Sequence, residues 1–192
     1  MDYRTSHQIR LKADKLLGPE VTDVDGIVED RSKTVSVFNG PEPIIKVFST
    51  KDEESNFVAE WILEQLQKMP AHEIGIFVRS DTQIQRAKDA VGKTLIPFIV
   101  LDDKVDAVSG KLAICTMHLA KGLEFKSVMV MGCDDEIIPL QERIENITDN
   151  ADLEEVYNTE RHLLYVACTR ARDILVITSL EPASEFLDDL RQ

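Results

Sequence analysis

The stretch Glu160–Thr178, ERHLLYVACTRARDILVIT, joins a helical pattern directly to a strand pattern. Its first apolar residues recur at spacings of three and four, which predicts a helix with one buried face over about 153–171. The β-branched run Ile174–Thr178 then predicts a buried strand. The helical stripe consists of Leu163, Leu164, Ala167 and Ala171.

Arg170 lies at the junction between this helix and this strand, with Thr169 and Arg172 beside it. The planar fork of a guanidinium group pairs with phosphate oxygens, so an arginine held at such a junction is well placed to meet an anionic ligand. The alternative is a solvated charge that follows a core helix. This stretch alone does not distinguish the two.

The rest of the chain alternates short apolar strands with helices, which predicts an α/β domain with a mostly parallel central sheet covered on both faces. Asn39-Gly40-Pro41 is a turn signal that allows a hairpin between the first two strands. The predicted strands are 34–38, 44–48, 74–78, 97–101, 112–116, 128–131 and 174–178. The predicted helices run from the cap Ser6 to 17, from Thr50 or Asp52 to 69, from the cap Asp81 to 91, over 153–171, and onward from Pro182.

The segment Thr116–Phe125, TMHLAKGLEF, connects two of these predicted strands. We expect its polar residues to lie at a strand's carboxyl end, where ligands bind in open α/β sheets. Gly122 permits a tight turn that brings the backbone close to a ligand. The polar residues are Thr116, His118, Lys121 and Glu124. A plain connection with surface charges remains the alternative.

Length and charge limit the function further. A chain of 192 residues fits one domain, and its net charge of −13 argues against strong autonomous binding to nucleic acid. Much of the acidic excess falls in 142–155, which we expect to be an acidic loop that ends in the first turn of a helix.

Several kinds of site and segment are not expected. The cysteines and histidines lack metal-ligand spacing, so we predict no metal site within the chain. No apolar run approaches the roughly 20 residues of a membrane span, and the start lacks a secretory signal, so we expect a cytoplasmic protein without a membrane segment. The abrupt start also suggests a piece of a longer chain.

Gly92-Lys93-Thr94 is similar to the end of a phosphate-binding P-loop but does not satisfy the full pattern. The first glycine of that pattern falls at Ala87, and the segment follows a predicted helix rather than a strand. A P-loop requires strand, loop and then helix, so that the helix N-terminus faces phosphate. Nucleotide chemistry therefore requires a phosphate cradle from elsewhere.

The two segments TMHLAKGLEF and HLLYVACTRAR together resemble motifs V and VI of UvrD/Rep-type superfamily 1 DNA helicases. The start, DYRTSHQIRLKADKLL, resembles motif IV, and IGIFVRSDTQIQRAKDAV resembles the strand–helix segment that follows it. The order and spacing agree over nearly the whole chain. The resemblance implies a single RecA-like three-layer α/β domain over 1–192, the second motor domain (2A), with motif IV on a helix in 1–18.

The resemblance also implies the roles of individual residues. Tyr3 stacks on adenine, Arg4 and Arg170 reach the γ-phosphate, and Glu124 binds the ribose hydroxyl beside Gly122. Arg170 is the arginine finger. Single-stranded DNA lies near Thr116 and His118, while Lys121 touches phosphate or braces its loop, and Arg79 is a basic position assigned to the same nucleic acid. ATP and Mg²⁺ are held mainly by the N-terminal motor domain of the same parent chain, which is the expected partner.

The chain departs from the family pattern in what it lacks. It has no P-loop and no Walker B acidic pair, so we expect the fragment alone to be inactive in ATP hydrolysis. Motifs IV and V lie too close together to hold the helical accessory domain 2B, so we predict a domain without that insertion. The alternative function is a non-catalytic interaction module that retained the fold and recruits a basic partner through its acidic surface.

Overall fold

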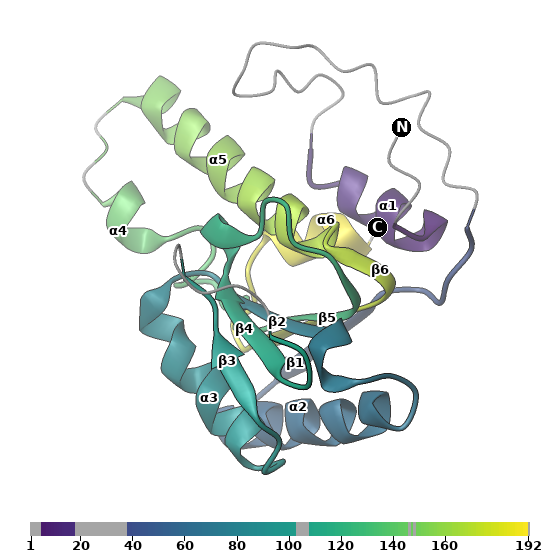
Figure 1. Ribbon diagram of the computed structural model, residues 1–192. Helices are drawn as coiled ribbons and strands as arrows, with labels where there is room; N and C mark the ends of the chain where they lie inside the picture. The colour runs from purple at the N-terminus through teal and green to yellow at the C-terminus, as the bar shows by residue number, and fades with distance from the viewer. Residues whose placement is uncertain (1–4, 18–37, 103–107, 146, 148, 192) are drawn as a thin grey trace.

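The computed structural model describes residues 5–17, 38–102, 108–145, 147 and 149–191. Strands and helices alternate along most of this chain (Figure 1). The elements, with η for a 3-10 helix, are α1 (His7–Asp14), β1 (Ile44–Phe48), α2 (Lys51–Leu66), η2 (Ala71–Glu73), β2 (Ile74–Val78), η3 (Asp81–Gln83), α3 (Ile84–Gly92), β3 (Phe98–Val100), β4 (Leu112–Thr116), η4 (Met117–Leu119), β5 (Phe125–Val130), α4 (Gln141–Ile144), α5 (Asn150–Cys168), β6 (Ala171–Leu180) and α6 (Phe186–Arg191).

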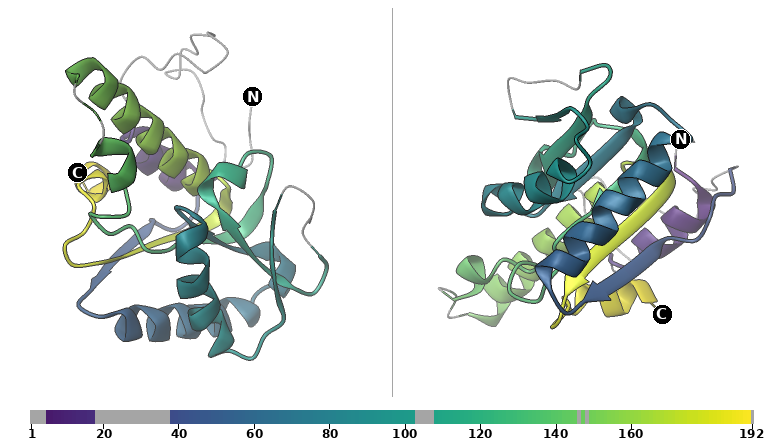
Figure 2. Two further views of the ribbon diagram at one scale, coloured as in Figure 1. Left: turned by 90° about the vertical axis from the view of Figure 1, so that its left-hand side faces the viewer. Right: turned by 90° about the horizontal axis from the view of Figure 1, so that it is seen from below.

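Six strands form one sheet in the order β1-β6-β5-β2-β4-β3, and every neighbouring pair is parallel. Helices α1, α5 and α6 cover one face of this sheet, and α2 and α3 cover the other (Figure 1). Figure 2 shows α2 and α3 side by side when the molecule is viewed from below. The predicted three-layer α/β fold with a parallel sheet is therefore confirmed.

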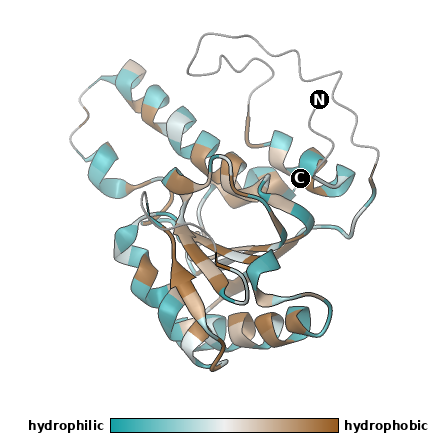
Figure 3. Ribbon diagram, in the orientation of Figure 1, coloured by the Kyte–Doolittle hydropathy of each residue, from teal (hydrophilic) through white to brown (hydrophobic). Residues whose placement is uncertain are grey.

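The sheet separates two hydrophobic cores because successive residues of a strand point to opposite faces. Phe77 and Cys115 pack in the core that includes Leu164 of α5. Their sequence neighbours Ile76 and Ile114 pack in the core formed with α2 and α3. Burial on both faces explains why the strands are continuously apolar rather than alternating. Figure 3 shows this concentration of hydrophobic residues in the strands.

Two predicted helix caps are confirmed. The Ser6 hydroxyl accepts a hydrogen bond from the Ile9 amide at the start of α1. Thr50 accepts from the Glu53 amide, and the Glu53 carboxylate accepts from the Thr50 amide in return, which forms a capping box. The α-helix α1 ends at Asp14, before the predicted residue 17, because the last turn tightens into bonds between residues three apart.

Some predicted boundaries were wrong. Asp81 does not cap a helix: it begins η3, and α3 starts only at Ile84. The acidic region 142–155 ends in the start of a helix as predicted, because α5 begins at Asn150, but the part before it also contains most of α4. The predicted strand 34–38 lies outside the described residues except for Phe38, whereas the turn Asn39-Gly40-Pro41 is described. The strand predicted to pair with residues 34–38 is β1, which pairs in parallel with β6.

Strand β5 begins at Phe125, three residues before the predicted start at 128. Phe125 pairs with Ala171 of β6, and its ring packs directly on Gly75 of β2. A Cβ atom at position 75 would lie 2.6 Å from Cδ2 of Phe125, so only glycine leaves room for this ring. The longer strand places Glu124 at the amino end of the sheet.

Candidate functional site

Arg170 occupies the turn between the end of α5 at Cys168 and the start of β6 at Ala171. Its Nε donates to the Val166 carbonyl over 3.0 Å, which satisfies an acceptor in the last turn of the helix. Nη1 donates to the Leu123 carbonyl over 3.4 Å, and Nη2 to the Thr169 hydroxyl over 3.3 Å. These bonds hold the half-buried guanidinium group at the junction.

Glu124 lies next to this junction. The Phe125 amide donates to the Arg170 carbonyl over 3.0 Å. The residues that precede β5 and β6 are therefore neighbours at the amino-terminal ends of these parallel strands, hereafter the amino edge of the sheet. The Glu124 side chain is exposed. Gly122, two residues earlier, has φ +89° and open space where a Cβ would lie. Glycine is therefore favoured here by the backbone conformation and not by lack of space.

The first described residues also reach this junction. The Thr5 hydroxyl donates to the Thr169 carbonyl over 3.0 Å, and the Ser6 amide donates to the Arg172 carbonyl over 2.9 Å. The motif IV segment is therefore anchored at Thr169 and Arg172, on either side of Arg170. Tyr3 and Arg4, the two motif IV residues predicted to contact nucleotide, lie outside the described residues.

The residues predicted to lie near DNA are found at the carboxyl-terminal ends of the strands, the opposite edge of the sheet. Thr116 ends β4 and is buried, and it pairs in register with Val78 of β2, just before Arg79. The exposed His118 follows in η4. Five strand residues separate the two edges by about 16 Å. The expectation that the polar residues cluster at a strand's carboxyl end was therefore wrong for Glu124. Lys121 lies in the exposed turn between His118 and Glu124.

Arg79 is almost inaccessible, with 1% of its surface exposed. Its Nε and Nη2 donate to the two carboxylate oxygens of Glu160 over 2.6 and 2.5 Å, a bidentate ion pair between the end of β2 and α5. Nη1 lies 3.4 Å from Nδ1 of His118. This burial does not fit the expectation that Arg79 contacts nucleic acid directly.

Glu160 is the functional candidate that sequence reasoning missed. It is fully buried and also accepts from Arg143 Nη1 over 3.0 Å and from the Leu140 amide over 3.3 Å. Burial favours a higher pKa for Glu160, but the hydrogen bonds and charge of Arg79 outweigh it and lower the pKa. A signal was present, because Glu160 precedes Leu164 by four residues and so continues the apolar stripe.

The environment of His118 disfavours its charged form. Burial contributes most to lowering the pKa of His118, and the positive charge of Arg79 adds to it. Glu160 and Asp81 act in the opposite direction, and Arg143 acts with Arg79.

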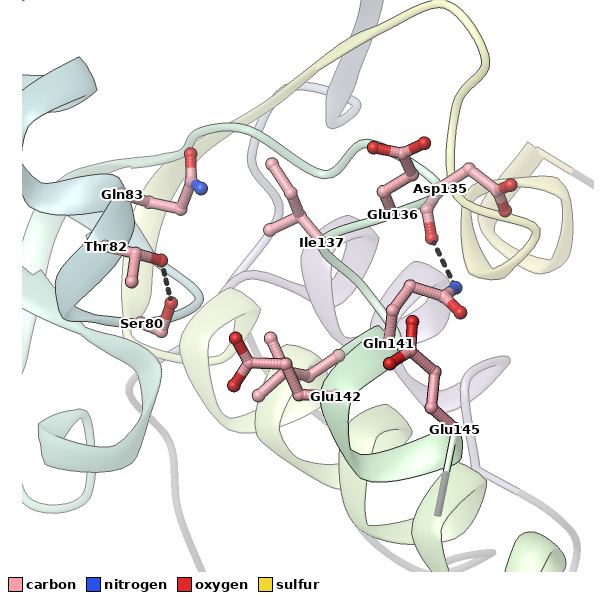
Figure 4. Close-up of a pocket in the computed structure, with 10 residues that line it drawn as sticks. Ser80, Thr82, Gln83, Asp135, Glu136, Ile137, Gln141, Glu142 and Glu145 are labelled. Carbon is pink, nitrogen blue, oxygen red and sulfur yellow. Dashed lines mark hydrogen bonds between the residues drawn. The ribbon is translucent and has the colours of Figure 1, made fainter. Parts of the chain in front are cut away.

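A cavity of about 600 Å³ opens between η3 and the segment that leads into α4 (Figure 4). Four carboxylates line it together with the Ser80 and Thr82 hydroxyls, which bond each other over 2.8 Å. The acidic lining residues are Asp135, Glu136, Glu142 and Glu145. None of the predicted site residues lines this cavity. Its negative charge disfavours a phosphate ligand, so we place no nucleotide there.

The described residues include no group of three or more side chains arranged to hold a metal ion. The cysteines are buried free thiols, and burial raises the pKa of the Cys115 and Cys168 thiols to about 12. Gly92-Lys93-Thr94 follows α3 and therefore has the reverse of the P-loop order. Within the same part of the chain, no helix has the length and apolar character needed to span a bilayer.

Residues 103–182 match the UvrD-like helicase C-terminal domain. The chain is 40% identical over 77 residues to the ATP-dependent DNA helicase PcrA of Staphylococcus epidermidis, a match that covers 40% of this chain and 10% of that protein. It is 34% identical over 114 residues to PcrA of Bacillus subtilis, which covers 53% of this chain and 14% of that protein. The matches thus span a small part of these relatives.

A solved structure shares the fold. It is described as the C-terminal domain of a possible DNA helicase from Lactobacillus plantarum WCFS1, and it superposes with a TM-score of 0.68. The match covers 99% of this chain and 94% of that chain at 18% sequence identity. At this identity the likeness supports the three-layer architecture and does not assign residue roles.

Proposed function

Because residues 103–182 match the UvrD-like helicase C-terminal domain, we propose that this chain is the second RecA-like motor domain (2A) of an ATP-dependent DNA helicase or translocase. In this proposal the domain completes an ATP site whose phosphate cradle lies in an N-terminal motor domain of the same parent chain. The residues 38–102 all build the sheet or its helical layers, which supports a single domain without a 2B insertion.

The observation that carries the proposal is the fixed position of Arg170. Three hydrogen bonds from its side chain and the backbone bond to Phe125 hold it at the amino edge of the sheet, beside Glu124. A guanidinium group that is already positioned stabilises charge on a transferring phosphoryl group without reorganisation. We assign Arg170 as the arginine finger, with Arg4 as a second arginine on the γ-phosphate.

The remaining nucleotide contacts follow from the same edge. We assign the Glu124 carboxylate to the ribose hydroxyl, Gly122 to the close backbone turn beside it, and Tyr3 to stacking on adenine. ATP and Mg²⁺ are held mainly by the N-terminal domain, and the described part of this chain presents no metal-binding cluster of its own. The site is complete only when two domains close, and closure followed by opening after hydrolysis provides a mechanical cycle.

We assign single-stranded DNA to the opposite edge, near Thr116, His118 and Lys121. Separation of the two edges by the length of the strands lets one rigid domain contact nucleotide and nucleic acid at once. The net charge of −13 is consistent with a domain that shares its grip on DNA with a partner domain rather than binding alone.

The role of Glu124 is testable in the full-length helicase. We expect Glu124→Ala to raise KM for ATP about 10- to 100-fold, because a hydrogen bond from a ribose hydroxyl to a carboxylate is worth about 1.5–3 kcal/mol. The measurement is steady-state hydrolysis of ATP and of deoxy-ATP analogues that lack one ribose hydroxyl. The variant should lose the preference for ATP over the affected analogue while kcat changes little. An unchanged preference would remove Glu124 from the nucleotide site.

A further inference from the structure

Arg79 and Glu160 form a buried ion pair whose geometry fixes the guanidinium group. Each carboxylate oxygen of Glu160 accepts one bond from Arg79, and the other donors to Glu160 are Arg143 and the Leu140 amide. The carboxylate is thus surrounded by four donors from two segments of the chain, the end of β2 and the start of α4. Because Nε and Nη2 of Arg79 are committed to Glu160, the remaining nitrogen Nη1 is directed toward His118.

This contact favours one neutral tautomer of the His118 ring. A guanidinium group only donates hydrogen bonds, so the ring nitrogen that faces it, Nδ1, must be an unprotonated acceptor. The ring proton then lies on Nε2. His118 is exposed in η4, so the ring lies within reach of a ligand at the carboxyl edge of the sheet.

The net effect of the surroundings of His118 also favours the neutral ring. Two arginines, Arg79 from the end of β2 and Arg143 from α4, face it together with two carboxylates, Glu160 from α5 and Asp81 from η3. Burial and the charge of Arg79 outweigh the carboxylates, so the pKa of His118 lies below its ordinary value. A second proton on the ring would also break its contact with Arg79.

We propose that Arg79 is a positioning residue that holds His118 as a neutral imidazole protonated on Nε2, so that η4 presents one uncharged hydrogen-bond donor to nucleic acid. The inference rests on the proposed function for the identity of the ligand. An uncharged donor recognises an acceptor oxygen or nitrogen and adds nothing to the salt dependence of binding. Glu160, which anchors Arg79, lies on the same helix that leads to Arg170.

The test is nitrogen and carbon NMR of the histidine rings in the 192-residue chain, with the His118 signals assigned by their loss in His118→Gln. We expect the wild-type ring at neutral pH to be uncharged with the proton on Nε2. We expect Arg79→Gln to raise the pKa of His118 and to mix its two neutral tautomers, because the donor and its positive charge are removed while Glu160 remains.

The matched control is Arg86→Gln. Arg86 is also buried and ion-paired, with Glu54 over 2.5 Å and with Asp134 over 2.6 Å, in a separate network. This variant removes an equal charge from another ion-paired network, one that does not contact His118, so it should lower stability while leaving the His118 titration unchanged. Equal shifts of His118 in both variants would indicate a general structural effect and overturn the inference.

The wild-type spectrum tests the inference even if Arg79→Gln does not fold. A wild-type His118 ring that carries its proton on Nδ1 would overturn the inference directly. Addition of oligo(dT) to the full-length helicase, in which both motor domains share the grip on DNA, separates the inference from the proposed function. A shifted Nε2 signal on saturation supports both. An Nε2-protonated ring whose signals do not move with oligo(dT) upholds the positioning by Arg79 and rejects the nucleic-acid role of His118.

Discussion

We expect Arg170→Ala to lower kcat for ATP hydrolysis by about 10³–10⁵-fold in the full-length helicase, the range found when an arginine finger is removed from phosphoryl-transfer enzymes. Little covalent chemistry is available to the protein in this reaction, so positioned positive charge accounts for much of the rate. The side chain of Arg170 is held by hydrogen bonds to Val166, Leu123 and Thr169. Its loss should therefore remove transition-state stabilisation with a smaller effect on KM.

Arg172 provides a matched control two residues away. Its Nε and Nη2 both bond the Asp173 carboxylate over 2.7 Å, so its charge is already paired at the surface. We expect Arg172→Ala to change kcat by only a few-fold. Steady-state ATP hydrolysis by the two variants distinguishes a specific finger from a general loss of positive charge. Equal losses in both variants would contradict the assignment of Arg170.

Glu160→Gln should lower the free energy of unfolding of the chain by about 3–5 kcal/mol, as measured by urea denaturation. The substitution keeps the shape of the side chain but leaves the Arg79 guanidinium buried at 1% exposure without its counter-charge. An exposed carboxylate offers the control. Glu64 pairs with Lys68 at the surface, so Glu64→Gln should change stability by at most about 0.5 kcal/mol.

This effect should depend on pH in a defined direction. The pKa of Glu160 in the folded chain is lowered, because the bonds and charge of Arg79 outweigh the opposing effect of burial. The carboxylate therefore stabilises the fold above its ordinary, unfolded pKa, and this contribution is lost as the pH falls through the lowered folded value. The difference in free energy of unfolding between wild type and Glu160→Gln should become smaller in acid. A gap that widens in acid would contradict the proposed ion pair.

Local sequence signals predicted the elements of the fold well. Ser6 and Thr50 are caps whose partners lie three residues away, so their hydrogen bonds follow from the sequence itself. The apolar strands were equally readable, but the predicted helix 153–171 ran past the turn that carries Arg170, because α5 ends at Cys168 and Ala171 begins β6. The fold class followed because alternating strands and helices leave few ways to bury both faces of a parallel sheet.

The errors came from contacts between residues far apart in the chain. The resemblance assigned Arg79 to nucleic acid, and nothing near it in sequence indicated that it pairs in the core with Glu160, 81 residues later. The start of β5 was missed because the polar residues Lys126 and Ser127 interrupt its apolar pattern, while the pairing that extends it depends on Ala171 and on the space above Gly75. That extension moved Glu124 to the same edge as Arg170.

The most direct test of the central claim, that this domain supplies one half of an ATP site, is ATP hydrolysis by the 192-residue chain alone with Mg²⁺. The arginine finger without a phosphate cradle has no bound substrate on which to act, so we predict no turnover above the rate in buffer. Turnover at enzyme-like rates that Arg170→Ala abolishes would contradict the claim, because it would place a complete site within this chain.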